Sequence, residues 1–129
     1  MPITSAVLIV ACTLWHECRG EPEEGQRAVA SVIVNRARER GRSPEAECLR
    51  PWQFSCWNGN KRLKDLLPNE HKRRTPAWLR CLLLARDVCA GTFEPTGTWN
   101  HYCRHDCHPA WRKAAKSETR IGAHVFMDL

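Results

Sequence analysis

The chain has 129 residues, enough for one domain with its own core but with little room for a second. Hydrophobic residues make up 43% of it and charged residues 26%, as in soluble globular proteins. No segment repeats or is of low complexity, which excludes solenoids and disordered tails. The net charge of +6 favours a polyanionic partner: nucleic acid, an anionic membrane face or an anionic cell envelope.

The chain carries eight cysteines, which is high for a cytosolic protein. Their even number favours disulfides formed in an oxidising compartment, with a pairing that the sequence does not define. Several of them lie inside apolar runs, where a free cysteine is a good small core residue. Both states therefore stay open for Cys12, Cys18, Cys48, Cys56, Cys81, Cys89, Cys103 and Cys107.

Three long helices are predicted from apolar periodicity and from residues that favour helix ends. The first is apolar nearly all round, which is typical of a central buried helix. Its apolar run, residues 6–11, is too short to cross a bilayer and has no basic residue before it, so it does not have the form of a signal peptide. The helices are expected from Thr4 or Ser5 to Gly20, from near Pro22 to residues 40–41, and from Thr75 and Pro76 to Gly91.

Shorter elements are expected between and after these helices. They are a helical turn at residues 43–44, a loop at 52–60, a short helix at 61–69, a loop or hairpin at 92–99, a helical turn at 111–117 and a terminal strand at 120–127. The predicted fold is therefore mainly α, in the α+β class, with a small β element and a single domain over residues 1–129.

Glu17 lies at the end of the first predicted helix, just before the chain breaker Gly20. Apolar surroundings disfavour the ionised form of a carboxylic acid and raise its pKa. A glutamate at this position can hold a proton near neutral pH and act as a general acid. The alternative is a solvated charge at a helix end, which is the commoner role of a glutamate.

Aromatic and amide side chains lie together in two predicted loops. Sugars stack their apolar faces on aromatic rings, while amides and hydroxyls bind their hydroxyl groups. The loops therefore favour a sugar-binding groove, and the alternative is that the tryptophans fill the interior of their own loops. The residues concerned are Trp52, Trp57 and Trp99 with Gln53, Ser55, Asn58, Asn60, Asn100 and His101.

A histidine- and cysteine-rich segment follows the second of these loops and contains His101, Cys103, His105, Cys107 and His108. Side chains of this kind bind zinc when four of them converge. No second ligand pair stands elsewhere in the chain, and a disulfide such as Cys103–Cys107 is an equal alternative. We expect no metal and no cofactor.

Eight short motifs follow one another over residues 17–126. They are Glu17-Cys18-Arg19-Gly20-Glu21, Glu24-Gly25-Gln26, Ala28-Val29-Ala30, Asn35-Arg36, Gln53-Phe54-Ser55, Asn100-His101-Tyr102, Pro109-Ala110-Trp111 and Ile121-Gly122 with His124-Val125-Phe126. Each motif alone is weak. Their order resembles the spore cortex-lytic, SleB-like family of cell wall hydrolases.

The resemblance implies a lysozyme-like, lytic-transglycosylase-like domain that cuts peptidoglycan at the β-1,4 bond between N-acetylmuramic acid and N-acetylglucosamine. It also implies that Glu17 is the catalytic acid. In a lytic transglycosylase this one glutamate protonates the bridging oxygen and then takes the proton of the muramic 6-hydroxyl. A muramidase needs a second carboxylate, for which Glu21 and Glu24 are candidates. We favour the mechanism with one glutamate and keep Glu24, which matches a family position, among the candidate catalytic residues.

Other residues receive roles from the same resemblance. Tyr102, the only tyrosine, is expected to hydrogen-bond Glu17 or the substrate. Asn35 and Arg36 are expected to hold helices together. The residues expected to bind substrate are Gln53, Phe54, Ser55, Trp57, Asn100 and His101.

The expected partner is peptidoglycan, with no nucleic acid and no stable membrane insertion. A small basic domain with neither a signal peptide nor a wall-binding domain is typical of a bacteriophage endolysin or virion-associated lysin. Such a protein is made in the bacterial cytoplasm and acts at the cell wall or periplasm, with virion or lysis-cassette proteins as further partners. The alternatives are a basic, zinc- or disulfide-stabilised nucleic-acid-binding module and a structural virion protein without activity. The first lacks interleaved aromatic and basic strands, and the joint presence of Glu17, Gln53 and Tyr102 disfavours the second.

Overall fold

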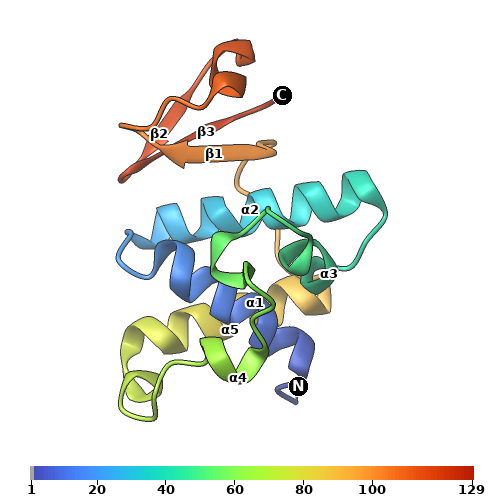
Figure 1. The fold of residues 1–129 in the computed structure, drawn as a ribbon, viewed down its shortest axis with the longest axis vertical. Helices are drawn as coiled ribbons and strands as arrows, with labels where there is room; N and C mark the ends of the chain where they lie inside the picture. Colours follow the sequence, from blue (N-terminus) through green and yellow to red (C-terminus); the bar gives the residue numbers. More distant parts are fainter. Residues whose placement is uncertain (1) are drawn as a thin grey trace.

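The computed structural model describes residues 2–129 as a helical body with a small sheet on one side (Figure 1). Its long helices are α1 (Ser5–Cys18), α2 (Glu23–Arg40) and α5 (Pro76–Ala90). Two short helices, α3 (Pro44–Leu49) and α4 (Leu63–Leu66), and the 3-10 turns Ser55–Trp57 and Lys72–Arg74 lie between α2 and α5. A third 3-10 turn, Ala110–Ala114, lies between the first two strands. The strands are β1 (His101–Arg104), β2 (Thr119–Ile121) and β3 (His124–Met127).

Local signals at both ends define the long helices. The side chain of Thr4 accepts a hydrogen bond from the Val7 amide at the start of α1, and Thr75 caps α5 in the same way. Gly41 and Gly91 end α2 and α5 with φ of 62° and 77°, in the left-handed region where a side chain would be strained. The three predicted long helices are confirmed.

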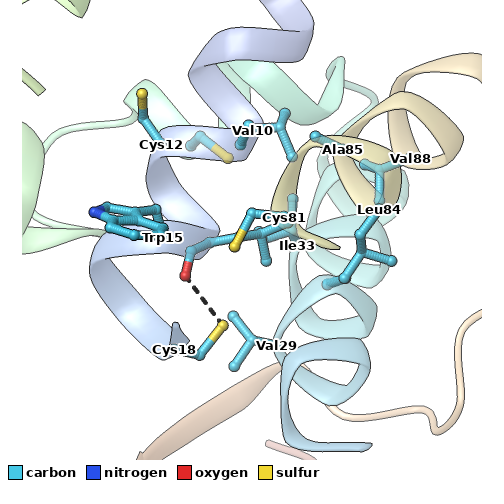
Figure 2. Packing of buried hydrophobic residues seen from close by; sticks show 14 of the residues in the cluster. Val10, Cys12, Trp15, Cys18, Val29, Ile33, Cys81, Leu84, Ala85 and Val88 are labelled. Atoms are coloured by element: carbon cyan, nitrogen blue, oxygen red, sulfur yellow. Dashed lines mark hydrogen bonds between the residues drawn. The ribbon is translucent and has the colours of Figure 1, made fainter. Parts of the chain in front are cut away.

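The core forms where α1 packs between α5 and α2. Figure 2 shows Cys18 of α1 beside Val29 of α2, while the Trp15 ring points away from these side chains. The Trp15 ring meets the Trp78 ring of α5 edge-on, with 5.9 Å between the ring centroids. The Cys18 thiol donates a hydrogen bond to the Leu14 carbonyl of its own helix, and all eight cysteines are free thiols. The cysteines of the helical body therefore serve as small core residues, which is one of the two predicted states.

A three-stranded antiparallel sheet in the order β1-β3-β2 lies over α2, on the side away from α5 (Figure 1). Tyr102 pairs with Phe126 and Ile121 with His124. The single strand predicted at residues 120–127 is wrong: this segment is a hairpin that turns at Gly122, with φ of 60°. Strand β1 was not predicted, because its alternating His, Tyr, Cys and Arg side chains give no apolar pattern.

One further prediction differs from the structure, and one open alternative is decided by it. The helix expected over residues 61–69 is limited to Leu63–Leu66, because Leu67 precedes Pro68 and adopts extended ψ of 128°. Residues 92–99 form a loop and no hairpin. Within residues 2–129, no helix has both the length and the apolar character needed to cross a membrane.

Candidate active site

A pocket of about 570 Å³ opens between the end of α1, the middle of α2, the loop before the Ser55–Trp57 turn and the sheet. Segments far apart in the sequence meet here because the sheet lies across α2. The pocket is lined by Glu17, Arg36, Trp52, Gln53, His101, Tyr102, Cys103, Arg104, Trp111 and His124.

Glu17 is the one carboxylate in this lining. Its side chain is half-buried, and burial raises its pKa above the usual value for a glutamate. A hydrogen bond from Tyr102 and the charge of His16 oppose the rise. The balance favours a carboxyl group that holds a proton closer to neutral pH than a solvated glutamate does, as the sequence predicted.

The Tyr102 hydroxyl donates a hydrogen bond to Oε1 of Glu17, also as predicted. The Tyr102 ring stacks on the Phe126 ring, with 5.6 Å between the ring centroids. It meets the His124 ring edge-on, with 5.2 Å between the centroids. Burial raises the pKa of Tyr102 well above its usual range, and the nearby Glu17 raises it further. The phenol therefore remains a neutral donor. Strand β1 thus holds a fixed donor against the candidate acid.

Glu21 is the carboxylate nearest to Glu17 along the chain, and its contacts hold the structure together. Its Oε1 accepts the amide hydrogen of Ala123 at 2.7 Å and lies 3.2 Å from Nδ1 of His124. Gly122 beside it has φ of 60°, where a side chain would be strained, and a Cβ there would also stand 2.7 Å from the same oxygen. Glu21 lines an adjoining hollow of about 270 Å³ that also contains Glu17, and it fastens the β2-β3 turn to the start of α2.

The predicted site residues divide into two groups. Gln53, His101 and Tyr102 line the pocket with Glu17. Four of the residues expected to bind substrate are not in its lining: Phe54, Ser55, Trp57 and Asn100.

The side chains of Phe54 and Trp57 belong to the core, with 1% and 9% of their surface exposed. The indole nitrogen of Trp57 donates to the Thr13 hydroxyl, which ties the loop to α1. Asn100 is occupied at the chain end, where its amide donates to the Leu129 carbonyl and its oxygen accepts from the Leu129 amide. Ser55 is exposed at the start of the 3-10 turn. The pocket wall in this region is formed instead by Trp52 and Gln53.

Glu24 lies in the first turn of α2 and is exposed. It lines neither the pocket nor the adjoining hollow, so the structure does not bring it together with Glu17. An acidic residue in the first helical turn interacts favourably with the helix dipole, and this accounts for its presence there.

Several lining residues were not predicted as site residues: Arg36, Cys103, Arg104, Trp111 and His124. Trp52, predicted as one of the aromatic residues of a sugar-binding groove, lines the pocket and is 81% exposed with φ of 66°, a rare backbone conformation for a bulky residue. The Trp111 ring packs against the His101 ring, with 5.0 Å between the ring centroids. The two tryptophans place aromatic surface at the pocket, as a sugar-binding groove requires.

The histidine- and cysteine-rich segment does not converge on one point. His101 and Cys103 line the pocket, whereas the carbonyls of His105 and Cys107 accept hydrogen bonds from Arg112. Among residues 2–129 no group of three or more His, Cys, Asp or Glu side chains has an arrangement suited to a metal ion. Arg112 organises this segment by binding its carbonyls and Glu118.

The sequence model of the cell wall hydrolase family matches residues 20–127. The chain belongs to this family. Its structure is similar to the catalytic domain of the germination-specific lytic transglycosylase SleB from Bacillus anthracis, with a TM-score of 0.70 and 24% sequence identity. The similarity covers 95% of this chain and 93% of that domain, so the two share a fold and the predicted mainly helical class is confirmed. No curated protein sequence matches the chain.

Proposed function

We propose that this cell wall hydrolase is a lytic transglycosylase that cleaves the β-1,4 bond between N-acetylmuramic acid and N-acetylglucosamine in peptidoglycan. The observation that carries the proposal is the pocket with a single carboxylate. Glu17 is half-buried in it, has a raised pKa and accepts a hydrogen bond from Tyr102. The similarity to a SleB domain, itself named a lytic transglycosylase, supports the same reaction.

In the first step Glu17 donates its proton to the oxygen that bridges the two sugars, and the bond between that oxygen and C1 of the muramic residue breaks. The N-acetylglucosamine leaves with a free 4-hydroxyl. The Tyr102 hydroxyl stabilises the carboxylate that this step produces, because it already donates to Oε1 of Glu17.

In the second step the 6-hydroxyl of the same muramic residue closes onto C1, and the Glu17 carboxylate takes its proton. The product is a 1,6-anhydro ring, no water is consumed, and Glu17 is again protonated. One carboxyl group serves as acid and then as base, which agrees with a pocket that offers no second carboxylate among its lining residues.

A muramidase is the second candidate, and Glu21 is the observation that favours it. Glycoside hydrolases usually pair an acid with a second carboxylate that acts as nucleophile or activates water. Glu21 lines the hollow next to Glu17, yet its Oε1 already accepts from the Ala123 amide and lies beside His124. These contacts leave it poorly placed to activate water, so we rank the muramidase second.

Mass spectrometry of the muropeptides released from purified peptidoglycan tests the proposal. We expect products that end in 1,6-anhydro-muramic acid from the unmodified protein, and a loss of about 10²- to 10⁴-fold in their rate of release in Glu17→Gln. Reducing muramic ends would show a hydrolase and direct attention to Glu21. No glycan products at all from the unmodified protein would contradict both candidates.

Glu24→Gln is the matched control, because it is the same substitution at an exposed glutamate outside the pocket. We expect its product spectrum and rate to equal those of the unmodified protein. Equal losses in Glu17→Gln and Glu24→Gln would contradict the assignment of Glu17 as the acid. The bacteriophage setting stays a prediction of the sequence.

A further inference from the structure

The wall of the pocket contains a guanidinium group with unused hydrogen-bonding capacity. Arg36 projects from α2 with only 11% of its side chain exposed, and its Nε lies 3.3 Å from Oε1 of the buried Glu47. Its Cζ stands over the ring of Phe54 at 5.8 Å. Arg36 thus holds α2 to α3, as predicted, but this role uses only one edge of the guanidinium.

The two terminal nitrogens of Arg36 have no hydrogen-bond acceptor among residues 2–129, and they are not among the buried polar atoms that lack a partner. Each therefore keeps some exposed surface, and Arg36 is one of the residues that line the pocket. A guanidinium fixed through Nε keeps two parallel N–H donors in a plane, which is the geometry that binds a carboxylate through two hydrogen bonds.

The charges around the pocket favour an anion. Arg36 and Arg104 both line it, and Glu17 is its one acidic group. Burial lowers the pKa of His101, with Arg36 adding to the effect, and burial also lowers the pKa of His124, so both imidazoles are neutral at neutral pH. With Glu17 protonated for its role as acid, the lining carries net positive charge.

The glycan strand of peptidoglycan carries negative charge on only one of its two sugars. N-acetylglucosamine is neutral, whereas the muramic residue bears a lactyl group that ends in a carboxylate or continues into a stem peptide with carboxylates of its own. A fixed arginine beside the candidate acid would therefore recognise the muramic residue and set the direction of the strand across Glu17.

We propose that Arg36 is a specificity-determining residue whose terminal nitrogens bind a carboxylate carried by the muramic residue of the substrate. The inference rests on the proposed function and adds to it the group that distinguishes peptidoglycan from a polymer of N-acetylglucosamine alone. Arg104, at the end of β1 and paired with Asp106 at 3.3 Å, adds positive charge from a more exposed position.

The test measures binding of soluble tetrasaccharides to Glu17→Gln by isothermal titration calorimetry, so that no ligand is cut. Three of the four ligands are tetrasaccharides in which N-acetylglucosamine and N-acetylmuramic acid alternate: one has free lactyl carboxylates, one has these carboxylates converted to methylamides, and one carries stem peptides. The fourth ligand is the tetramer of N-acetylglucosamine. We expect the free acid to bind about tenfold more tightly than its methylamide, as for a hydrogen-bonded ion pair at a partly buried site.

The ligands also separate the two sources of the carboxylate. A preference for the free acid over the methylamide assigns the lactyl group, and a preference for the stem-peptide form over both assigns the peptide. Equal affinity for all three muramic ligands would overturn the inference while leaving the proposed function intact. Failure to bind any of the four would count against the proposed function itself.

Arg36→Gln and Arg40→Gln, each added to Glu17→Gln, form the matched pair. Both arginines lie beside Oε1 of Glu47, with Nε at 3.3 and 3.5 Å, but Arg40 does not line the pocket. We expect Arg36→Gln to abolish the preference for the carboxylate and Arg40→Gln to keep it. If Arg36→Gln does not fold, Arg36→Lys takes its place, because it keeps the charge beside Glu47 but lacks the two parallel N–H donors. It should reduce the preference for the carboxylate ligand. An unchanged preference in the folded Arg36 variants would contradict the inference.

Discussion

Glu47 and Glu17 are both withdrawn from solvent, but their partners differ. Glu47 is fully buried, and its Oε1 lies within 3.5 Å of the guanidinium groups of Arg36, Arg40 and Arg50. Glu17 is half-buried at a pocket and accepts a hydrogen bond from a neutral donor, the Tyr102 hydroxyl. The first carboxylate is surrounded by compensating charge, whereas the second is left with burial as the largest influence on its ionisation.

The difference separates a structural carboxylate from one suited to proton transfer. A buried charge is tolerated when opposite charges surround it, and it then holds elements together, here α3 to α2. A carboxylate that is buried without such charges has a raised pKa and can exchange a proton near neutral pH. Arg36 belongs to both regions, since it contacts Glu47 and lines the pocket of Glu17.

The largest effect on stability is expected from Glu47→Gln. The neutral amide would leave three arginines without their shared counter-charge, one of them with 11% of its side chain exposed. Removing one partner of a buried ion pair costs about 3 kcal/mol or more, and we expect a loss of about that size in the free energy of unfolding measured with denaturant. Glu45→Gln, on the same helix but outside this cluster, is the control, and equal stability of the two variants would remove the distinction drawn between Glu47 and Glu17.

The long helices could be predicted from the sequence because their signals are local. Thr4, Thr75, Gly41 and Gly91 act within one turn of the helix ends that they define. Glu17 could be singled out as the candidate acid for a similar reason, since its place at the end of a helix that is apolar nearly all round already favours burial.

Residues whose role depends on distant partners could not be placed in this way. The amide-rich loop predicted a sugar-binding wall, but an aromatic pattern does not tell which ring turns inward, and Phe54 and Trp57 enter the core while Trp52 faces out. Arg36 and His124 reach the pocket only because the sheet lies across α2, a contact between segments far apart in the chain.

Tyr102→Phe removes the one hydrogen-bond donor that Glu17 has among residues 2–129. The Tyr102 hydrogen bond lowers the pKa of Glu17, so its loss should raise that pKa further. A general acid works while it is protonated, and the rate falls as pH rises through its pKa. We therefore expect the alkaline limb of the pH–rate profile to move to higher pH, with a loss of about 10- to 100-fold in maximal rate from poorer positioning. A limb that stays in place or moves to lower pH would show that Tyr102 does not act through Glu17.

The smallest effect is expected in the stability of Glu17→Gln as a function of pH. Because folding raises the pKa of Glu17, this group stabilises the folded state fully below its unfolded pKa of about 4.3, and that contribution is lost as pH rises through the folded pKa. A glutamine keeps an acceptor for the Tyr102 hydroxyl and has no charge to desolvate. The variant should therefore match the unmodified protein in thermal unfolding near pH 3 and become the more stable of the two by pH 8. The opposite trend, with the variant losing stability as pH rises, would mean that a partner in the folded protein favours the ionised form of Glu17, and that its burial does not keep it protonated for proton transfer.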